Sequence, residues 1–247
     1  MATFEIRRGA DRARTSTEWL DSAHSFAFGS HYDPDNLGFG ALQACNEDTL
    51  QPGPGYPVHA HRDVEILTWV LAGSLTQLAE GGEPTVLVSG DLHHVSAGSG
   101  IRHTEFSSLP GEPVHLVQMW LRPDTGGTPP RTCRLAAGAR LAGGGWVPLA
   151  SGSADPAEPD VLRIQQQAAL SAARLPAGAT LALPVAPLVH LFVTTGLVTV
   201  EGRDELAAGD ALRVTGEPAQ PAVLTALEPA ELLVWQLPDD ATAVPSG

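Results

Sequence analysis

Two pairs of potential metal ligands lie in the first half of the chain. His59 and His61 form one pair, and His103 and Glu105 form the other. Residues two apart in an extended strand point to the same face, so each pair can direct both side chains at one ion. Three imidazoles and one carboxylate on neighbouring strands would make a metal site with open coordination positions. The alternative is that these residues are separately hydrogen-bonded polar groups at the mouth of a barrel.

The sequence predicts that the elements that position these residues are β-strands. The chain of 247 residues contains 26 Gly and 21 Pro, which favours short strands joined by turns over a helical bundle. We predict an all-β protein with strands over 65–71, 85–88, 116–121, 188–194, 197–200 and 232–237. Residues 137–159 are rich in Gly, Ala, Ser and Pro and predict an irregular connection. We therefore expect two domains, 1–140 and 141–247.

An internal repeat indicates that the two halves are copies of one β-unit. LTWVLAGSL over 67–75 matches HLFVTTGLV over 190–198, and a Gly-Asp pair follows each stretch. The repeat predicts a pseudo-symmetric pair of β-barrels. In the second copy the four ligand positions hold residues that cannot bind a metal, namely Ala182, Pro184, Ala222 and Leu224. We therefore expect one metal in the first barrel and none in the second.

Three further residues lie close to these pairs in the sequence. Glu65 follows His61 by four positions, and because four ligands are already available we expect it to orient an imidazole through a hydrogen bond. His93 and His94 are adjacent in a strand, so one of them must point inward. We expect these two histidines to lie at the polar rim of the barrel or to support the metal ligands through hydrogen bonds, and not to bind the metal themselves.

The charge of the chain bears on its partners and location. The formal net charge is −14, and all the cations are arginines. Because such a surface repels phosphate backbones, we predict no direct binding to nucleic acid. The obvious local group of cations is Arg7, Arg8, Arg12 and Arg14. No apolar run is long enough for a membrane span and no secretory signal is visible, so we expect a cytoplasmic protein without membrane partners.

The sequence resembles the pirin family of the cupin superfamily. The resemblance is carried by HSFAFGSHYDPDNLGFGALQACNED over 24–48, HAHRDVEILTWVLAGSL over 59–75 and GDLHHVSAGSGIRHTEF over 90–106. It is strong over residues 4–125 and looser in the second half. It implies a bicupin, with two stacked cupin β-barrels and a metal, usually iron, in the N-terminal barrel only. The metal ligands that it implies are His59, His61, His103 and Glu105.

The chain departs from the pirin pattern at two places. Ala60 stands where pirins commonly have Pro, and His93 and His94 stand where they have Gln followed by a bulkier residue. The second change alters the neighbourhood of the pocket and bears on the substrate. The wider cupin pattern places a ligand Glu in the first motif, which would make Glu65 the fourth ligand in place of Glu105.

Two functions follow from the resemblance. Some bacterial pirin-like proteins are quercetin 2,3-dioxygenases, which implies a metal-dependent dioxygenase that cleaves quercetin-like flavonols or related phenolics with O2. Glu105 would then be the catalytic base that accepts the flavonol 3-hydroxyl proton. The implied cofactor is one divalent transition metal, Fe(II) before Mn, Co, Ni or Zn.

The second function is a non-enzymatic, iron-binding, redox-sensing regulator that acts through a protein partner. Both functions need the same ligands. An open pocket at the metal, large enough for a flavonoid, would favour the enzyme.

Overall fold

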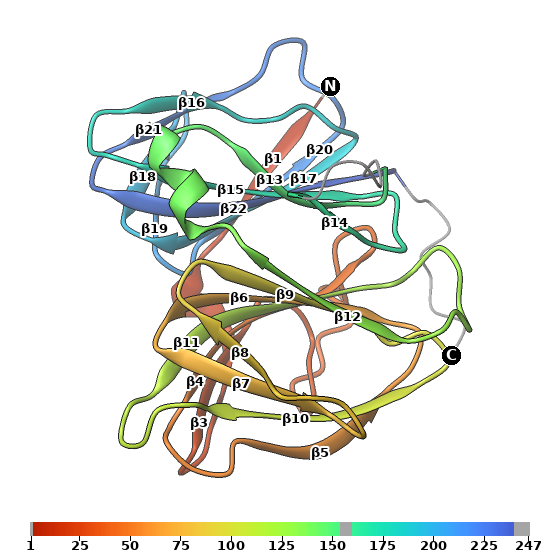
Figure 1. Cartoon of the computed structure of the whole chain (residues 1–247). Helices are drawn as coiled ribbons and strands as arrows, with labels where there is room; N and C mark the ends of the chain where they lie inside the picture. The colour runs from red at the N-terminus through yellow and green to blue at the C-terminus, as the bar shows by residue number, and fades with distance from the viewer. Residues whose placement is uncertain (1, 154–159, 240–247) are drawn as a thin grey trace.

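The computed structural model describes residues 2–153 and 160–239, and these residues form two stacked β-barrels (Figure 1). Each barrel consists of a seven-stranded sheet and a four-stranded sheet. The described residues contain two short 3-10 turns, η1 (Gly9–Asp11) and η2 (Gly138–Gly143). No helix among them is long and apolar enough to cross a membrane. The prediction of an all-β bicupin is confirmed.

The strands of the first barrel come mostly from the first half of the chain. In sheet order, the large sheet is β12 (Arg131–Ala136), β9 (Asp91–Ser96), β6 (Glu65–Ala72), β11 (Val114–Leu121), β4 (Leu42–Leu50), β3 (Leu20–His24) and β2 (Ala13–Ser16). The small sheet is β5 (Tyr56–His61), β10 (Ile101–Ser107), β7 (Ser74–Ala79) and β8 (Thr85–Val88).

The second barrel repeats this arrangement. Its large sheet is β1 (Thr3–Arg7), β20 (Ala211–Thr215), β17 (Leu188–Thr195), β22 (Ala230–Leu237), β15 (Ala169–Leu175), β13 (Val147–Ser151) and β14 (Leu162–Arg163). Its small sheet is β16 (Thr180–Ala182), β21 (Val223–Ala226), β18 (Leu197–Val200) and β19 (Glu205–Ala207). The small sheets correspond strand for strand, β5-β10-β7-β8 to β16-β21-β18-β19.

Equivalent glycines mark equivalent turns in the two barrels. Gly73 joins β6 to β7 with φ 76°, and Gly196 joins β17 to β18 with φ 82°. A Cβ at Gly73 would collide with the carbonyl oxygen of Pro113, and one at Gly196 with that of Pro229. Only glycine fits both the positive φ and the close approach. The repeat seen in the sequence is therefore one supersecondary unit used twice.

Each barrel contains one strand that lies, in chain order, just before the strands of the other barrel. Strand β1 precedes all the strands of the first barrel, yet it pairs with β20 in the second barrel. Strand β12 precedes β13 to β22, yet it pairs with β9 in the first barrel. The expected domain of residues 1–140 therefore differs from the structure at β1, which completes the other barrel. Pairing between distant segments leaves no local pattern, so spacing alone could not place this strand.

The connection between the barrels is more regular than the sequence predicted. We expected irregular chain over residues 137–159, but η2 and β13 lie within this stretch. Residues 154–159 lie outside the described residues.

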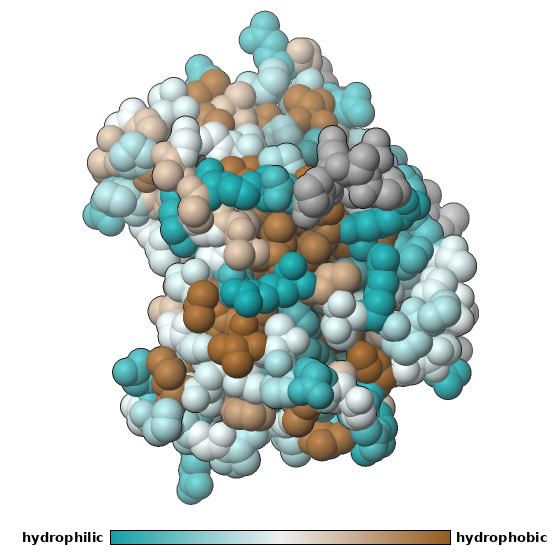
Figure 2. Space-filling model, viewed as in Figure 1, coloured by the Kyte–Doolittle hydropathy of each residue, from teal (hydrophilic) through white to brown (hydrophobic). Residues whose placement is uncertain are grey.

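The two large sheets pack back to back through a shared core. Trp69, Leu92 and Met119 of the first barrel lie in one buried cluster with Phe192 and Trp235 of the second. The indole of Trp235 donates a hydrogen bond to the Met119 sulfur at 3.2 Å. Figure 2 shows hydrophobic residues gathering in the groove between the barrels. The large sheets are thus covered on both faces, whereas the small sheets have one face toward solvent.

Candidate metal centre

Strands β5 and β10 bring three imidazoles together inside the first barrel. They pair antiparallel, with His103 opposite His59 and Ile101 opposite His61. One donor atom from each of His59, His61 and His103 lies within 4.8 Å of the other two. The predicted grouping of the three histidines is therefore present, and it follows from strand alternation on two neighbouring strands.

The nitrogen geometry of this cluster suits a transition metal. Nε2 of His103 lies 2.9 Å from Nε2 of His59. Two nitrogens that each lie about 2.1 Å from one ion, at right angles, are roughly 3 Å apart. His59 donates its Nδ1 proton to the carbonyl oxygen of Pro57 at 2.8 Å, which leaves its Nε2 lone pair free. The donor set therefore fits a divalent ion.

The protonation of the cluster also suits metal binding. Burial and the neighbouring His59 lower the pKa of His61 to about 4. Burial, with His59 and His61, lowers the pKa of His103 to about 3. The amide of Gln77 lies 2.5 Å from Nδ1 of His103, and with its oxygen turned to that position it accepts the Nδ1 proton. Neutral imidazoles with free Nε2 lone pairs are the form that binds metal.

Glu105 follows His103 by two residues on β10, and its contact is with Gln118. It is buried, and it points to the same side of β10 as His103. Its Oε2 accepts a hydrogen bond of 3.1 Å from the Gln118 amide. Burial, aided by the charge of Asp48, raises the pKa of Glu105 to about 7. It is not among the three residues whose donor atoms cluster within 4.8 Å, so its place as fourth ligand stays a prediction.

Glu65 faces away from the cluster. Its Oε2 lies 2.8 Å from Nε2 of His94 and accepts the backbone N–H of Gln165 at 2.9 Å, and its Oε1 accepts a hydrogen bond from Ser96. Glu65 does contact an imidazole, as expected, but that of His94 and not of a predicted ligand. These contacts join the first barrel to residue 165 of the second half.

His93 takes the opposite face of β9 from His94. It is buried, and its Nε2 has no hydrogen-bond partner among the described residues. Burial, with His94, lowers the pKa of His93 to about 4, and His93 in turn contributes to lowering the pKa of His103. His93 is therefore the inward member of the pair and lies near the cluster.

Sequence reasoning missed the polar groups that support the site. Gln77 and Gln118 contact His103 and Glu105, and Tyr56 donates a hydrogen bond of 3.1 Å to the buried carboxylate of Asp48. The signal was present at Gln118, an amide within the otherwise apolar run LVQMWL. A polar side chain buried in such a run needs a partner, and that partner here is Glu105.

Aromatic rings cover one side of the cluster. The Trp120 ring meets His61 edge-on with centroids 5.0 Å apart, and Phe28 packs on Trp120 at 5.2 Å. Trp120 also donates its indole N–H to Oε1 of Gln118 at 2.9 Å. On another side, His61 lies in the wall of an open cavity of about 790 Å³, together with Arg62 and Arg102.

Comparison with known proteins places this architecture in a family. The Pirin family model matches residues 7–121, and a model described as the quercetinase C-terminal cupin domain matches residues 145–237. A Mycobacterium tuberculosis protein named "Putative quercetin 2,3-dioxygenase" is 46% identical over 237 residues, which make up 96% of each chain. This chain belongs to the pirin family.

Two further relatives extend the comparison. The crystal structure of the bacterial pirin YhhW from Escherichia coli in complex with nickel(II) superposes on this pirin with a TM-score of 0.86. The two chains are 30% identical, over 96% of this pirin and 99% of that chain. The quercetin 2,3-dioxygenase of Escherichia coli K12 is 39% identical over 126 residues, which are 51% of this pirin and 54% of that protein.

Proposed function

We propose that this pirin is a metal-dependent dioxygenase that opens the ring of quercetin-like flavonols or related phenolics with O2. The observation that carries the proposal is the cluster of the imidazoles of His59, His61 and His103, with His61 in the wall of a cavity of about 790 Å³. Cavities of roughly 300–1,000 Å³ are typical of small-molecule sites. The relatives named quercetin 2,3-dioxygenase support the same reaction.

The three histidines would hold the metal, with Glu105 as the proposed fourth ligand. A divalent transition metal, Fe(II) before Mn, Co, Ni or Zn, supplies Lewis acidity and one-electron chemistry with O2 when it is bound. The cavity wall carries Arg62, Arg102 and Arg131, and one carboxylate, that of Glu80, which contacts Arg102 at 3.2 Å. This excess of positive charge favours a phenolic substrate that becomes an anion as it reacts.

Glu105 is the proposed base. Its Oε2 is occupied by the Gln118 amide, which leaves Oε1 to accept the proton of the flavonol 3-hydroxyl. Trp120 fixes the orientation of Gln118 by donating to its Oε1, so that the amide nitrogen faces Glu105. The proton thus moves to a carboxylate that the barrel holds in one place. O2 is the oxidant, and one ring carbon leaves as carbon monoxide.

The regulator hypothesis is less well supported. A redox sensor that acts through a protein surface does not need a small-molecule cavity at its metal, whereas His61 lines an open one. The cavity therefore favours the enzyme.

The test is an assay for the products of ring opening. The chain is loaded anaerobically with Fe(II), and in parallel with Mn, Co, Ni or Zn, and then given quercetin and O2. We expect quercetin loss, O2 uptake and carbon monoxide in equal amounts for at least one metal. His115 contacts Glu47 outside the cluster, so the His115→Ala variant is the matched control and should stay active. Full metal binding without quercetin loss for every metal would refute the flavonol reaction.

A further inference from the structure

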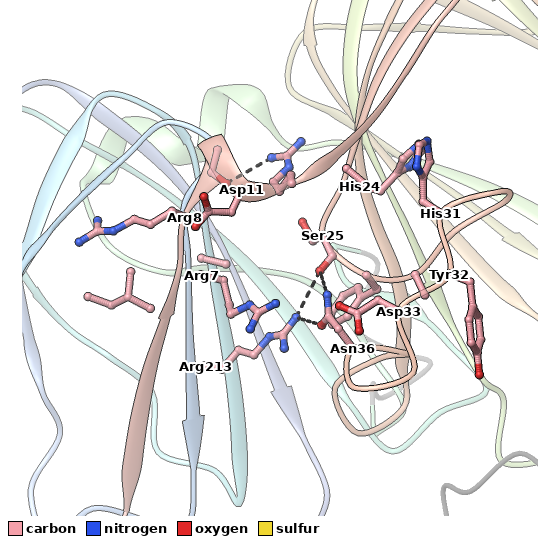
Figure 3. A pocket seen from close by; sticks show the side chains of 17 residues that line it. Arg7, Arg8, Asp11, His24, Ser25, His31, Tyr32, Asp33, Asn36 and Arg213 are labelled. Atoms are coloured by element: carbon pink, nitrogen blue, oxygen red, sulfur yellow. Dashed lines mark hydrogen bonds between the residues drawn. The ribbon is translucent and has the colours of Figure 1, made fainter.

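A second cavity lies between the barrels, away from the histidine cluster. It has a volume of about 420 Å³, and residues of both barrels line it, as Figure 3 shows. From the N-terminal segment come Arg7, Arg8 and Arg12; from β20 comes Arg213; and from the loop after β3 come residues that include Asn36. Four arginines around one cavity are unexpected in a chain of net charge −14.

Two of these arginines are already neutralised. Arg8 contacts the carboxylate of Asp210 at 2.9 Å and that of Asp204 at 3.3 Å. Arg12 contacts Glu47 at 3.0 Å. These ion pairs hold the N-terminal segment against both barrels. They leave little positive charge for a ligand.

Arg7 and Arg213 are different, because they share one carboxylate. Strands β1 and β20 pair with Glu5 opposite Arg213, which places Arg7 diagonally across from Arg213 on the same face. Glu5 is half exposed; it lies 3.0 Å from Arg7 and 4.0 Å from Arg213. Two guanidinium groups thus face the cavity with one partly solvated counter-charge. Their mutual repulsion contributes, after burial, to lowering the pKa of Arg213 to about 10.

Arg213 is also incompletely paired. It is only 6% exposed, and its Nε has no hydrogen-bond partner among the described residues. Its NH2 group donates to Oδ1 of Asn36 at 2.8 Å and to the backbone oxygen of Ser25 at 3.3 Å. These partners are neutral, and the Glu5 carboxylate at 4.0 Å is half exposed, so the buried charge of Arg213 is poorly compensated. An oxyanion in the cavity would supply the missing charge.

The other charged groups of the wall do not fill this role. Asp11 and Asp33 are carboxylates of the lining, but both are exposed to solvent. Exposed carboxylates are screened by water and salt, and an anion can displace them from a buried guanidinium. His24 and His31 of the lining are already hydrogen-bonded through Nε2 to the Thr15 hydroxyl, at 2.9 and 3.2 Å.

We propose that this cavity binds a small molecule bearing a carboxylate or phosphate group, held by the guanidinium groups of Arg7 and Arg213. Planar guanidinium groups bind such oxyanions with paired, charge-assisted hydrogen bonds. A volume of about 420 Å³ admits a small metabolite and not a macromolecule. Because the site lies between the barrels, its occupant bridges β1, β20 and the loop after β3.

The test is calorimetric titration of the whole chain with inorganic phosphate and, separately, with citrate, at constant ionic strength set by NaCl. We expect saturable binding of one anion per chain to at least one probe, and the tighter probe identifies the preferred group. Arg7→Gln should weaken it about tenfold or more, since it removes a charge-assisted contact. Arg7→Lys, which keeps the charge, should lose less.

Two controls locate the binding. Arg14→Gln makes the same charge change at an exposed arginine outside the lining and should bind as the native chain does. The double variant His59→Ala/His61→Ala should also bind normally, because the histidine cluster is a separate site. No saturable binding tighter than about 10 mM, equal loss in Arg7→Gln and Arg14→Gln, or loss in the double histidine variant would each overturn the proposal.

Discussion

The two barrels share one strand order but differ in the side chains that fill their interiors. Inside the first barrel are imidazoles, carboxylates and amides, among them His103, Glu105 and Gln118. Inside the second is an apolar cluster that includes Leu191, Leu212 and Leu224. Both keep the glycine turns and sheet order that the fold requires. The fold thus depends on turns and apolar packing present in both copies, and the chemistry depends on a few polar residues present in one.

The largest expected effect comes from changing the polar interior at the proposed metal ligands. The double variant His59→Ala/His61→Ala should lower metal affinity at least about a hundredfold, because loss of a group that only supports a ligand already costs roughly 10–100-fold. Metal per chain, measured by elemental analysis, should fall from one to near zero, and activity with it. Two metals per native chain, or full occupancy in the double variant, would contradict a site confined to the first barrel.

Removing an apolar side chain from the interior of the second barrel should lower the stability of the protein. Leu224 is fully buried at the position that matches Glu105, so Leu224→Ala should lower the free energy of unfolding by about 2–5 kcal/mol. Leu227→Ala, at a leucine that is 42% exposed, is the matched control and should change it by less than about 0.5 kcal/mol. Urea unfolding measures both. Metal content should not change in either variant, and a loss of metal in Leu224→Ala would show that the barrels are coupled.

Glu105→Gln tests the proposed base without changing the shape of the interior. If Glu105 accepts the substrate proton, turnover should fall about 10²-fold or more while metal content falls less, since three histidines remain. The assay is quercetin consumption with carbon monoxide detection, and metal is measured on the same samples. Unchanged turnover would remove Glu105 from the mechanism.

A smaller effect concerns the one histidine of the second barrel. His190 is fully buried on the face of β17 turned to the first barrel, and burial, with Arg213, lowers its pKa to about 3 from 6.5. Between these pH values the unfolded chain binds more protons, so stability is complete above pH 6.5 and is lost as the pH falls.

The variant His190→Leu copies Leu67, the matching residue of the first barrel. Between pH 6.5 and pH 5 the native chain should lose about 2 kcal/mol more than this variant. Urea unfolding at the two pH values measures the difference, and equal losses would show that His190 does not titrate as burial requires.

The histidine cluster was accessible from the sequence because of where its strands lie. Strand β10 belongs to a small sheet with one solvated face, and from Arg102 to Ser107 its residues alternate between exposed or half-buried and buried. The sequence alone therefore shows which residues of β10 share a face, and it places His103 and Glu105 on the same one. The glycine turns could be read for a similar reason, since positive φ constrains a single residue and its neighbours.

The sequence does not show in this way on which face of its strand Glu65 lies. It lies on β6, in a large sheet covered by its own barrel on one face and by the second barrel on the other. Both faces of such a strand are buried, so apolar residues occupy both and the period of two disappears. Only the structure shows that Glu65 meets His94 and Gln165 and not the three histidines.

The sequence by itself thus determined an all-β pair of barrels and a three-histidine cluster in the first, because strand alternation and glycine turns are local properties. Only the tertiary structure decided which barrel receives β1, that Glu65 contacts His94 and not the three histidines, and that Arg7 and Arg213 share a cavity. These are pairings between residues far apart in the chain. They depend on how the two large sheets pack, and no local spacing encodes that.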